Sequence, residues 1–477
     1  MTYRASVELD TLMDKLLGKE KDDFYQCIDN PLPHTIRFNT LKGEIHQLKE
    51  FLEEQRFQVE NFPGFQDIFR LLYQPYPIGK SLSHFLGHFY VQDIASMLPP
   101  RILNPQPGEI VLDLSAAPGS KTTQLAVMMK NQGMILANDI VSKRLRALIN
   151  NLHRMGVIHT AVTKSFGESI GNLYFETFDK ILLDPACSGL GTLHKTPEVL
   201  SWWTPNHCLR LAANQKSLIS SAIKALKPGG ILVYSTCTLT PDENEEVIHF
   251  ARERFPIEIL AFDITPLKSR PALTKFNGKT FHPELQNCRR LYPFENETEG
   301  FFIAKLRKTD RLPKPFLKKE ESIYHIPVLS HKTSPVKKYL DYFADHFAIP
   351  RTEFSRYEYQ ISKEITLMSH ELAQFPFRTK PLKSGLTIAH VLTQIGKLTT
   401  EGVHFFGNHI KKNRVDLEDL LQVEDFVNRH HLQIPRAGDN QLAFYYKEIP
   451  IGYGLAEDNK VKSQFPKAEW PFHLAER

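Results

Sequence analysis

The chain has 477 residues, of which 42% are hydrophobic and 24% are charged, and its formal net charge is +5. This composition excludes a mostly disordered chain and, at roughly 150 residues per domain, predicts about three domains. No apolar run reaches the ~18 residues of a membrane-spanning helix, and the N-terminal residues show no secretion signal. Five scattered cysteines favour a reducing compartment over a disulfide framework. We therefore expect a cytoplasmic protein with no membrane contact.

The first 80 residues are expected to form a small α/β unit. Leucines near a 3.6-residue period predict a helix over 1–30. The segment 34–40 has the pattern of a strand, and 44–55 has the pattern of a helix. Prolines and a glycine between residues 75 and 80 interrupt any regular element and predict a domain boundary there.

Strands and helices are expected to alternate from residue 81 to residue 308. Helical spacing is found over 142–155 and 207–226. Short apolar runs occur at 109–114, 134–139, 160–165, 178–184, 229–235 and 300–306. Uniformly apolar strands separated by helices predict a mostly parallel sheet that is covered by helices on both faces.

Basic residues and prolines dominate the segment that follows the last of these strands. Only three acidic residues lie between positions 305 and 338. The basic residues there are Lys305, Arg307, Lys308, Arg311, Lys314, Lys318, Lys319, Lys332, Lys337 and Lys338. This pattern predicts either a linker that binds a polyanion or a merely solvated connector. We place this linker and a small intermediate domain at 309–380.

The C-terminal segment 381–477 is expected to form a separate small module. A helical pattern over 417–429 is followed by the strand-like segment LAFYYKEIPIGYG, which starts at residue 442. This order predicts a small α/β or β-barrel module.

A loop of small residues follows the strand at 109–114. It consists of Ser115, Ala116, Ala117, Pro118, Gly119, Ser120 and Lys121. A helix that begins near Ser120 would let a ligand approach the backbone at the carboxyl edge of the sheet. The next strand ends at Asp139, where an acid commonly accepts ribose hydroxyls. The fingerprints for NAD and for a phosphate-binding P-loop are both missing. The loop is therefore a candidate nucleoside site, and the alternative is an ordinary strand-to-helix turn.

Two cysteines follow neighbouring strands of the predicted sheet. Asp184 and Cys187 follow the strand at 178–184, and Cys237 follows the strand at 229–235. Parallel strand ends meet at one edge, so these side chains are expected near the small-residue loop. Free cysteines are often simply buried, and neither of the two has a C-x-x-C partner or a nearby histidine that would favour zinc. We expect no metal site.

Together these segments resemble the Nop/Sun family of RNA cytosine-5 methyltransferases. The resemblance lies in DLSAAPGSKT (113–122), LLDPACSGLGTLHKTPE (182–198), STCTLTPDENEEVI (235–248), IRFNTLK (36–42) and YVQDIASMLP (90–99). The helical start, basic linker and C-terminal module are similar to one subgroup, the bacterial ribosomal RNA small subunit methyltransferases F. The implied α/β fold has a Rossmann-like methyltransferase sheet, an N-terminal RNA-binding extension and a PUA-like C-terminal RNA-binding module.

The resemblance also implies roles for individual residues. Cys237 would add to C6 of cytosine, and C5 would then take the methyl group of S-adenosyl-L-methionine. Cys187 would assist release, while Asp184 would stabilise the protonated adduct and lie beside the cofactor. Residues 115–121 and Asp139 would hold the cofactor. Phe166 stands where the family commonly has an acid beside adenine, which leaves a backbone contact or ring stacking.

The family usually reads Asp-Ala-Pro-Cys, whereas this chain reads Asp184-Pro185-Ala186-Cys187. Proline fixes its own φ and restricts the residue before it, so Asp184 is expected to be held differently.

The implied substrate is 16S ribosomal RNA, free or within the small subunit, at cytosine 1407 of the decoding-site helix. Three alternatives are open. The first is the same chemistry on tRNA or 23S ribosomal RNA. The second is a non-catalytic RNA-binding ribosome assembly factor, which the retained Cys237 and Asp184 disfavour. The third is an NAD-dependent oxidoreductase, which the missing glycines disfavour.

Overall fold

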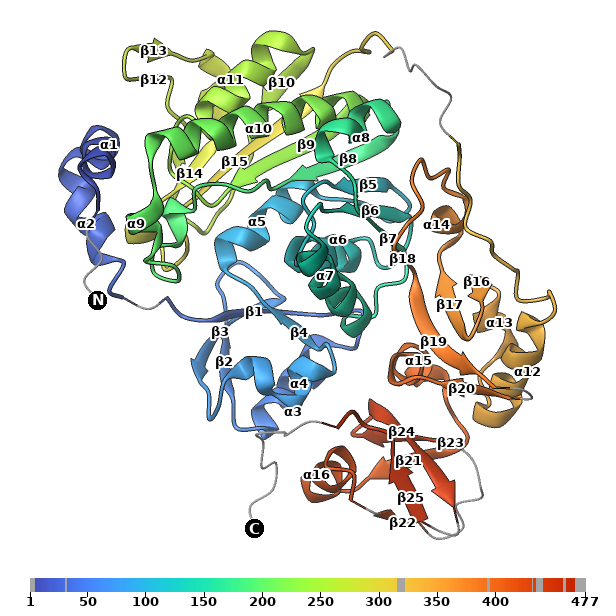
Figure 1. Ribbon diagram of the computed structural model, residues 1–477. Coiled ribbons are helices and arrows are strands. Elements are labelled where there is room, and N and C mark those ends of the chain that lie inside the picture. The colour runs from blue at the N-terminus through green and yellow to red at the C-terminus, as the bar shows by residue number, and fades with distance from the viewer. Residues whose placement is uncertain are drawn as a thin grey trace.

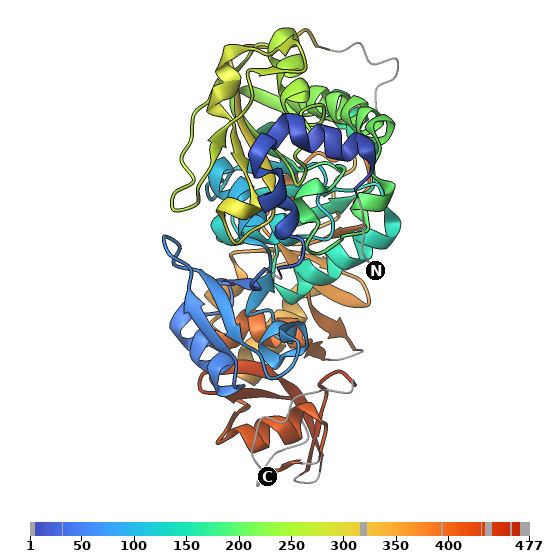
Figure 2. The same ribbon diagram turned by 90° about the vertical axis from the view of Figure 1, so that its left-hand side faces the viewer.

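The computed structural model describes residues 5–30, 32–314, 322–392, 395–430, 432–434, 441–457 and 460–467. A large central sheet lies above a four-stranded N-terminal sheet, and the C-terminal part of the chain forms two more sheets beside and below them (Figures 1 and 2). In the described part of the chain, no helix combines the length and apolar character needed to cross a membrane.

The chain starts with two helical segments where the sequence predicted one helix. Gly18 has a φ of +56°, in the left-handed region that favours glycine, and it ends the first helix. The segments are α1 (Val7–Leu17) and α2 (Lys21–Gln26), joined by a short 3₁₀ turn (Gly18–Glu20). Leu9 and Met13 pack in one cluster with Leu190 and Leu193. The N-terminal helices therefore cover the loop that follows Cys187.

A four-stranded sheet in the order β2-β3-β1-β4 forms the N-terminal unit. Its elements are β1 (Thr35–Phe38), α3 (Ile45–Glu54), β2 (Gln58–Asn61), β3 (Ile68–Tyr73), a 3₁₀ turn (Ile78–Lys80), α4 (Leu82–Phe85) and β4 (Phe89–Val91). The predicted strand at 34–40 and helix at 44–55 are confirmed. Ile36 pairs with Val91, so the sheet continues past residue 80, where we placed the domain boundary.

The central sheet has the order β11-β14-β15-β9-β8-β5-β6-β7-β18, and β10 also pairs with β15. Strands β5 to β9 are parallel, and β15 runs antiparallel to β9. All six predicted strands are confirmed. They are β5 (Ile110–Asp113), β6 (Met134–Asn138), β7 (Thr160–Thr163), β8 (Phe178–Leu183), β9 (Leu226–Thr236) and β15 (Phe301–Lys308).

Helices cover both faces of this sheet (Figure 1). One face carries α8 (Gly167–Leu173), α10 (Pro205–Ala225) and α11 (Glu245–Arg254), whose apolar residues share a core with Leu112 and Ile181. The other face carries α5 (Ile94–Leu103), α6 (Ser120–Met128) and α7 (Ser142–Arg154), packed around Val111 and Leu182. Adjacent residues of one strand therefore feed opposite cores, as expected of a sheet buried on both sides.

Short elements complete this region. They are α9 (Val199–Trp202), β10 (Ile257–Leu260), β11 (Arg270–Pro271), β12 (Lys275–Phe276), β13 (Lys279–Thr280), β14 (Arg289–Leu291) and 3₁₀ turns at Leu190–Thr192, Pro283–Asn287 and Pro293–Glu295.

The basic segment is not one uniform patch. Its first three cations, Lys305, Arg307 and Lys308, belong to β15. Lys308 is fully buried with its Nζ 3.0 Å from a carboxylate oxygen of Glu176, so it cannot contact RNA. Exposed cations follow at Arg311, Lys314, Lys332, Lys337 and Lys338. Lys318 and Lys319 lie outside the described residues, as do Glu320 and Glu321.

The intermediate module has a sheet in the order β16-β17-β19-β20, which runs across the boundary expected at residue 380. The elements are α12 (Val336–Phe347), α13 (Arg351–Phe354), β16 (Glu358–Ile361), β17 (Glu364–Met368), α14 (His370–Gln374), β18 (Lys383–Ser384), β19 (Leu386–Val391), β20 (Gly396–Leu398), α15 (Thr400–Phe406) and a 3₁₀ turn (Gly407–His409). Strand β18 pairs with β7, and Phe375 stacks on Tyr174. Strand β18 thus extends the central sheet, and Phe375 belongs to its core.

A five-stranded sheet in the order β21-β23-β24-β25-β22 ends the described chain. The elements are β21 (Arg414–Leu417), α16 (Leu420–Val427), β22 (Leu432–Gln433), β23 (Gln441–Tyr446), β24 (Ile449–Glu457) and β25 (Lys460–Ser463). The predicted helix and the strands after it are confirmed. Phe426 and Ile451 share an apolar cluster with Leu82 of the N-terminal unit, so the C-terminal sheet and its helix pack against that unit (Figure 1).

Candidate active site

The small-residue loop connects β5 to α6 at the carboxyl edge of the parallel strands. Gly119 has a φ of +108° and immediately precedes the helix. A Cβ atom at this position would lie 2.9 Å from Cδ1 of Leu148 on α7. Only glycine therefore fits here, and it lets the start of α6 pack closely against α7.

Asp139 follows β6 and lies directly beside this loop. One of its carboxylate oxygens accepts the N–H of Ala117 at 3.2 Å, and the other accepts the N–H of Val141 at 2.9 Å. Arg144 lies 3.5 Å from the same carboxylate, and the guanidinium also donates to the carbonyl of Ala117. The acid predicted to bind ribose thus also fixes the shape of the loop.

Phe166 follows β7 and precedes α8. Its side chain is 68% exposed, whereas most large apolar residues of this sheet are buried. An exposed ring just past the end of β7, the strand that pairs with β6, offers a flat surface on which a base can stack. The structure therefore places Phe166 at the same edge as the loop, with most of its surface exposed.

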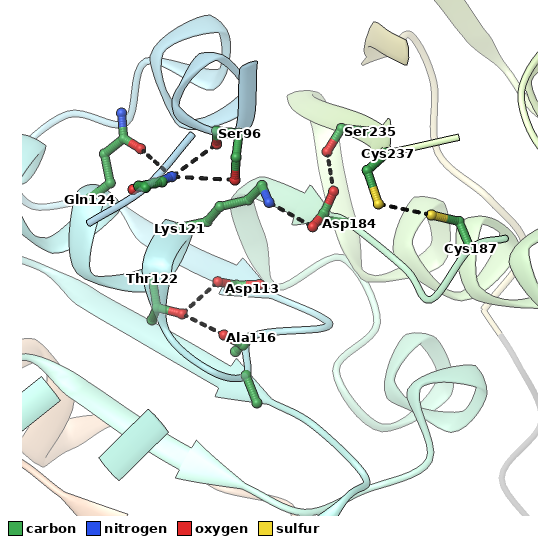
Figure 3. Close-up of polar contacts among 12 residues, drawn as sticks. Ser96, Asp113, Ala116, Lys121, Thr122, Gln124, Asp184, Cys187, Ser235 and Cys237 are labelled. Carbon is green, nitrogen blue, oxygen red and sulfur yellow. Dashed lines mark hydrogen bonds and ion pairs between the residues drawn. The ribbon is translucent and has the colours of Figure 1, made fainter. Parts of the chain in front are cut away.

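Asp113, the last residue of β5, was not singled out from the sequence. The side chain is buried, and the carboxyl accepts a hydrogen bond from Oγ1 of Thr122 at 2.7 Å (Figure 3). Burial raises the pKa of this carboxyl to about 7. An acid that ends a strand directly before a small-residue loop was the signal that could have identified it.

Lys121 connects the loop to the cysteine-bearing strands. Its Nζ lies 2.7 Å from one carboxylate oxygen of Asp184, and the other oxygen accepts a hydrogen bond from Ser235 at 2.7 Å (Figure 3). Burial acts to lower the pKa of Lys121, but attraction to Asp184 raises it. Asp184 is thus held by a cation and a hydroxyl despite the exchanged Pro185-Ala186 order. Ser235 was also missed by the sequence analysis.

The two predicted cysteines meet at the ends of β8 and β9. Sγ of Cys187 lies 3.3 Å from Sγ of Cys237, and both residues are partly buried (Figure 3). The hydrogen bond with Cys237, together with burial, raises the pKa of the Cys187 thiol well above its ordinary value. Cys187 therefore stays protonated at neutral pH and can donate its S–H to the Cys237 sulfur.

Comparisons with known proteins identify families that match most of the chain. A family described as 16S rRNA methyltransferase RsmB/F matches residues 100–307. A second family, the N-terminal domain of 16S rRNA methyltransferase RsmF, matches residues 8–94 and so includes β4.

Individual relatives match over long stretches. The ribosomal RNA small subunit methyltransferase F of Aliivibrio fischeri (strain MJ11) is 32% identical over 461 residues, which cover 94% of this chain and 93% of that protein. The tRNA (cytosine(49)-C(5))-methyltransferase of Pyrococcus abyssi (strain GE5 / Orsay) is 39% identical over 290 residues, 61% of this chain and 92% of that protein.

A solved structure of a methyltransferase homolog protein from Pyrococcus horikoshii is 41% identical and covers 62% of this chain and 93% of its own, with a TM-score of 0.56. The central sheet is thus a Rossmann-like methyltransferase fold. With the similarity to the Aliivibrio protein extending over nearly the whole of both sequences, the chain belongs to the ribosomal RNA small subunit methyltransferase F family of RNA methyltransferases.

Proposed function

We propose that this protein forms 5-methylcytosine in 16S ribosomal RNA with S-adenosyl-L-methionine as the methyl donor. The observation that carries this proposal is the pair of sulfurs, 3.3 Å apart, that two neighbouring strand ends place beside Asp184. Addition to a pyrimidine ring needs a nucleophile that is also a good leaving group, and a thiolate meets both requirements.

The residues along the sheet edge fit the proposed cofactor. Asp139 supplies carboxylate oxygens for ribose hydroxyls, and the exposed ring of Phe166 supplies a stacking surface for adenine. The backbone of 115–121 and the ion pair between Lys121 and Asp184 present both charges that a zwitterionic amino-acid tail requires. The bound cofactor would supply an electrophilic methyl group.

Cys237 is the proposed nucleophile. Its thiolate adds to C6 of cytosine, a C–S bond forms, and the electron pair of the C5–C6 double bond moves to C5, which then takes the methyl group. Lys121 and Asp184 lie next to this position, and the Asp184 carboxylate can stabilise a cytosine that is protonated at N3. The S–H of Cys187 stabilises the attacking thiolate in the same way.

Cys187 is proposed to assist release. A base must take the C5 proton, the electron pair of that C–H bond must re-form the C5–C6 double bond, and the C6–S bond must break with its electron pair returning to sulfur. A hydrogen bond from Cys187 to that sulfur makes the thiolate a better leaving group.

The exposed cations after β15 and the C-terminal, PUA-like module are proposed to contact RNA. Arg311, Lys314 and Lys332 are exposed.

Removing the chain from residue 310 is not a clean test of this proposal, because β18 and Phe375 belong to the catalytic sheet and its core. Arg311, Lys314 and Lys332 should instead be replaced together by glutamine. The RNA association constant falls as the salt concentration rises. Each lost phosphate contact should make the slope of its logarithm against the logarithm of the salt concentration less steep by roughly 0.7–0.9. An unchanged slope would show that the basic segment after β15 does not contact RNA phosphates and is only a solvated connector.

The target is proposed to be cytosine 1407 of the decoding-site helix. Mapping 5-methylcytosine in ribosomal RNA from a strain that lacks the gene should show one cytosine that loses its methyl group, and the purified protein should restore it on small subunits or free RNA. The second candidate substrate is tRNA, because a relative named as a tRNA methyltransferase is 39% identical over 290 residues. Loss of methylation in tRNA or 23S RNA would favour that class, and unchanged methylation everywhere would favour a non-catalytic assembly factor.

A further inference from the structure

A buried carboxylate lies between the two cysteine-bearing loops. Glu243, just before α11, is fully buried. One of its oxygens accepts the backbone N–H of Ser188 at 3.0 Å and the side-chain amide of Gln215 at 3.0 Å. The other oxygen accepts the hydroxyl of Thr240 at 2.7 Å. Every one of these partners donates, which suits a carboxylate because it only accepts hydrogen bonds.

These hydrogen bonds connect the two loops through one side chain. Ser188 directly follows Cys187, and Gln215 on α10 also donates to the carbonyl of Ala186 at 2.9 Å. Thr240 belongs to the loop that starts at Cys237. One carboxylate thus holds the Cys187 loop with one oxygen and the Cys237 loop with the other.

Neighbouring contacts reinforce this connection. The hydroxyls of Ser188 and Thr238 lie 2.7 Å apart across the two loops. The hydroxyl of Tyr234, on β9, donates to the backbone carbonyl of Glu243 at 2.7 Å. Strand β9 therefore fixes the backbone of Glu243, while helix α10 and both loops fix its carboxylate.

The charge of Glu243 is not explained by an ion pair. Within the described ranges, no lysine, arginine or histidine forms a salt bridge with this carboxylate. A buried charge without a cation is costly unless its hydrogen bonds compensate. The hydrogen bond with Cys237 and burial do most to raise the pKa of the Cys187 thiol, and the negative charge of Glu243 adds to them.

We infer that Glu243 is a positioning residue, which holds the sulfurs of Cys187 and Cys237 in contact and keeps Cys187 as the S–H donor. The inference rests on the proposed function for its catalytic meaning, but the geometry that it concerns exists without RNA. Because the carboxylate binds both loops, its loss removes a link between them and leaves three donors without the oxygens that accept from them.

The test uses the full-length chain with the variants Glu243→Ala and Glu243→Gln. Glu246→Gln is the matched control, because Glu246 is nearby on α11 but binds Lys216 and Lys279 instead of the loops. The first measurement needs no RNA. Iodoacetamide modification of each cysteine is followed against pH by peptide mass spectrometry. We expect Cys187 to react faster, and from a lower pH, in Glu243→Ala than in the wild type or in the control.

The second measurement is steady-state methylation. A displacement of the loops by about 1 Å should lower kcat by about a hundredfold, with the KM for RNA and for the cofactor unchanged. Glu243→Gln should restore most of kcat, because the amide oxygen can accept from Ser188 and Gln215 while its NH₂ donates to Thr240. If Glu243 had only a structural role, its loss would not lower kcat while KM stays unchanged. It also would not shift the pH dependence of modification for Cys187 alone.

A second variant protects the test against misfolding. Thr240→Val removes one hydroxyl and nearly preserves the side-chain shape. It breaks the hydrogen bond that fixes the Glu243 carboxylate to Thr240, together with a longer 3.4 Å contact to the hydroxyl of Thr238. It should shift the Cys187 profile and kcat in the same direction as Glu243→Ala. The inference would be overturned if Glu243→Ala had the wild-type pH dependence of Cys187 modification and the wild-type kcat. If Glu243→Ala does not fold, the same result in Thr240→Val would overturn it. If the wild type methylates no RNA, the proposed function fails, whereas the cysteine profiles still decide the role of Glu243.

Discussion

The two halves of the catalytic edge are held in different ways. In the cofactor half, the loop 115–121 is shaped by its backbone and by Asp139, and Phe166 is left exposed. In the cysteine half, the sulfurs lie on loops that are bound to each other by buried side chains. A site that exchanges a small molecule in every turnover needs access, whereas a covalent step needs its reacting atoms within a few tenths of an ångström. The contrast follows from these two demands.

The largest effect is expected from Cys237→Ala. Without this thiolate no bond to C6 can form, so methylation should fall below detection and no protein–RNA adduct should survive denaturing electrophoresis. Cys237→Ser should behave in the same way, because a serine hydroxyl is far less acidic than a thiol. Cofactor affinity, measured by calorimetry, should not change. Cys288→Ala, which alters a buried cysteine just before β14, is the control and should stay active.

Cys187→Ala should fail differently. Attack and methyl transfer can proceed, but the sulfur of Cys237 loses the donor that stabilises it as it leaves. An adduct should therefore accumulate on denaturing gels, and the double variant with Cys237→Ala should lose it. Normal turnover without an adduct would show that release uses another group. If the two alanine variants exchanged phenotypes, the two roles would have to be exchanged as well.

In the cofactor half, Asp139→Asn should have an intermediate effect. Asparagine turns one acceptor oxygen into a donor, so the side chain can no longer accept from both ribose and the loop backbone. Calorimetry should show cofactor binding weakened by about 1–3 kcal/mol, the usual cost of a lost charged hydrogen bond. Asp263→Asn removes a comparable acid that binds the backbone N–H of Thr265, and it should leave affinity unchanged. Equal affinities in the two variants would exclude Asp139 from the cofactor site.

Residues that follow predicted strands were well placed by the sequence. Apolar runs located β5, β6, β8 and β9, and parallel pairing then forces the residues after them to one edge. Asp184, Cys187 and Cys237 meet there for that reason, even though Pro185 and Ala186 are exchanged. The partners of these residues could not be predicted in the same way. Gln215 reaches the site from α10 through tertiary packing, which has no short-range pattern in the sequence. Glu243 lies within the segment 235–248, but its position in the sequence does not reveal that it binds the Cys187 loop.

Charge counting was less informative than strand position. Lys308 was counted in the basic segment, but it ends β15 and pairs with Glu176 inside the protein. The domain boundaries expected at 80 and 380 each fall within a unit that the structure completes with a later strand, β4 in one case and β19 in the other. Long-range antiparallel pairing decides such boundaries, whereas proline and glycine mark only local interruptions.

The smallest effect is expected from Phe166→Ala. The ring is 68% exposed, so its removal creates no cavity in the core and should not change the melting temperature. If adenine stacks on it, cofactor affinity should fall by about 0.5–1.5 kcal/mol, a factor of about two to twelve. Phe166→Tyr keeps the ring and should bind like the wild type, whereas Phe166→Leu should resemble the alanine variant. Equal cofactor affinity in all three Phe166 variants would show that adenine does not stack on this ring. Cofactor binding would then depend on the backbone of 115–121 and on Asp139.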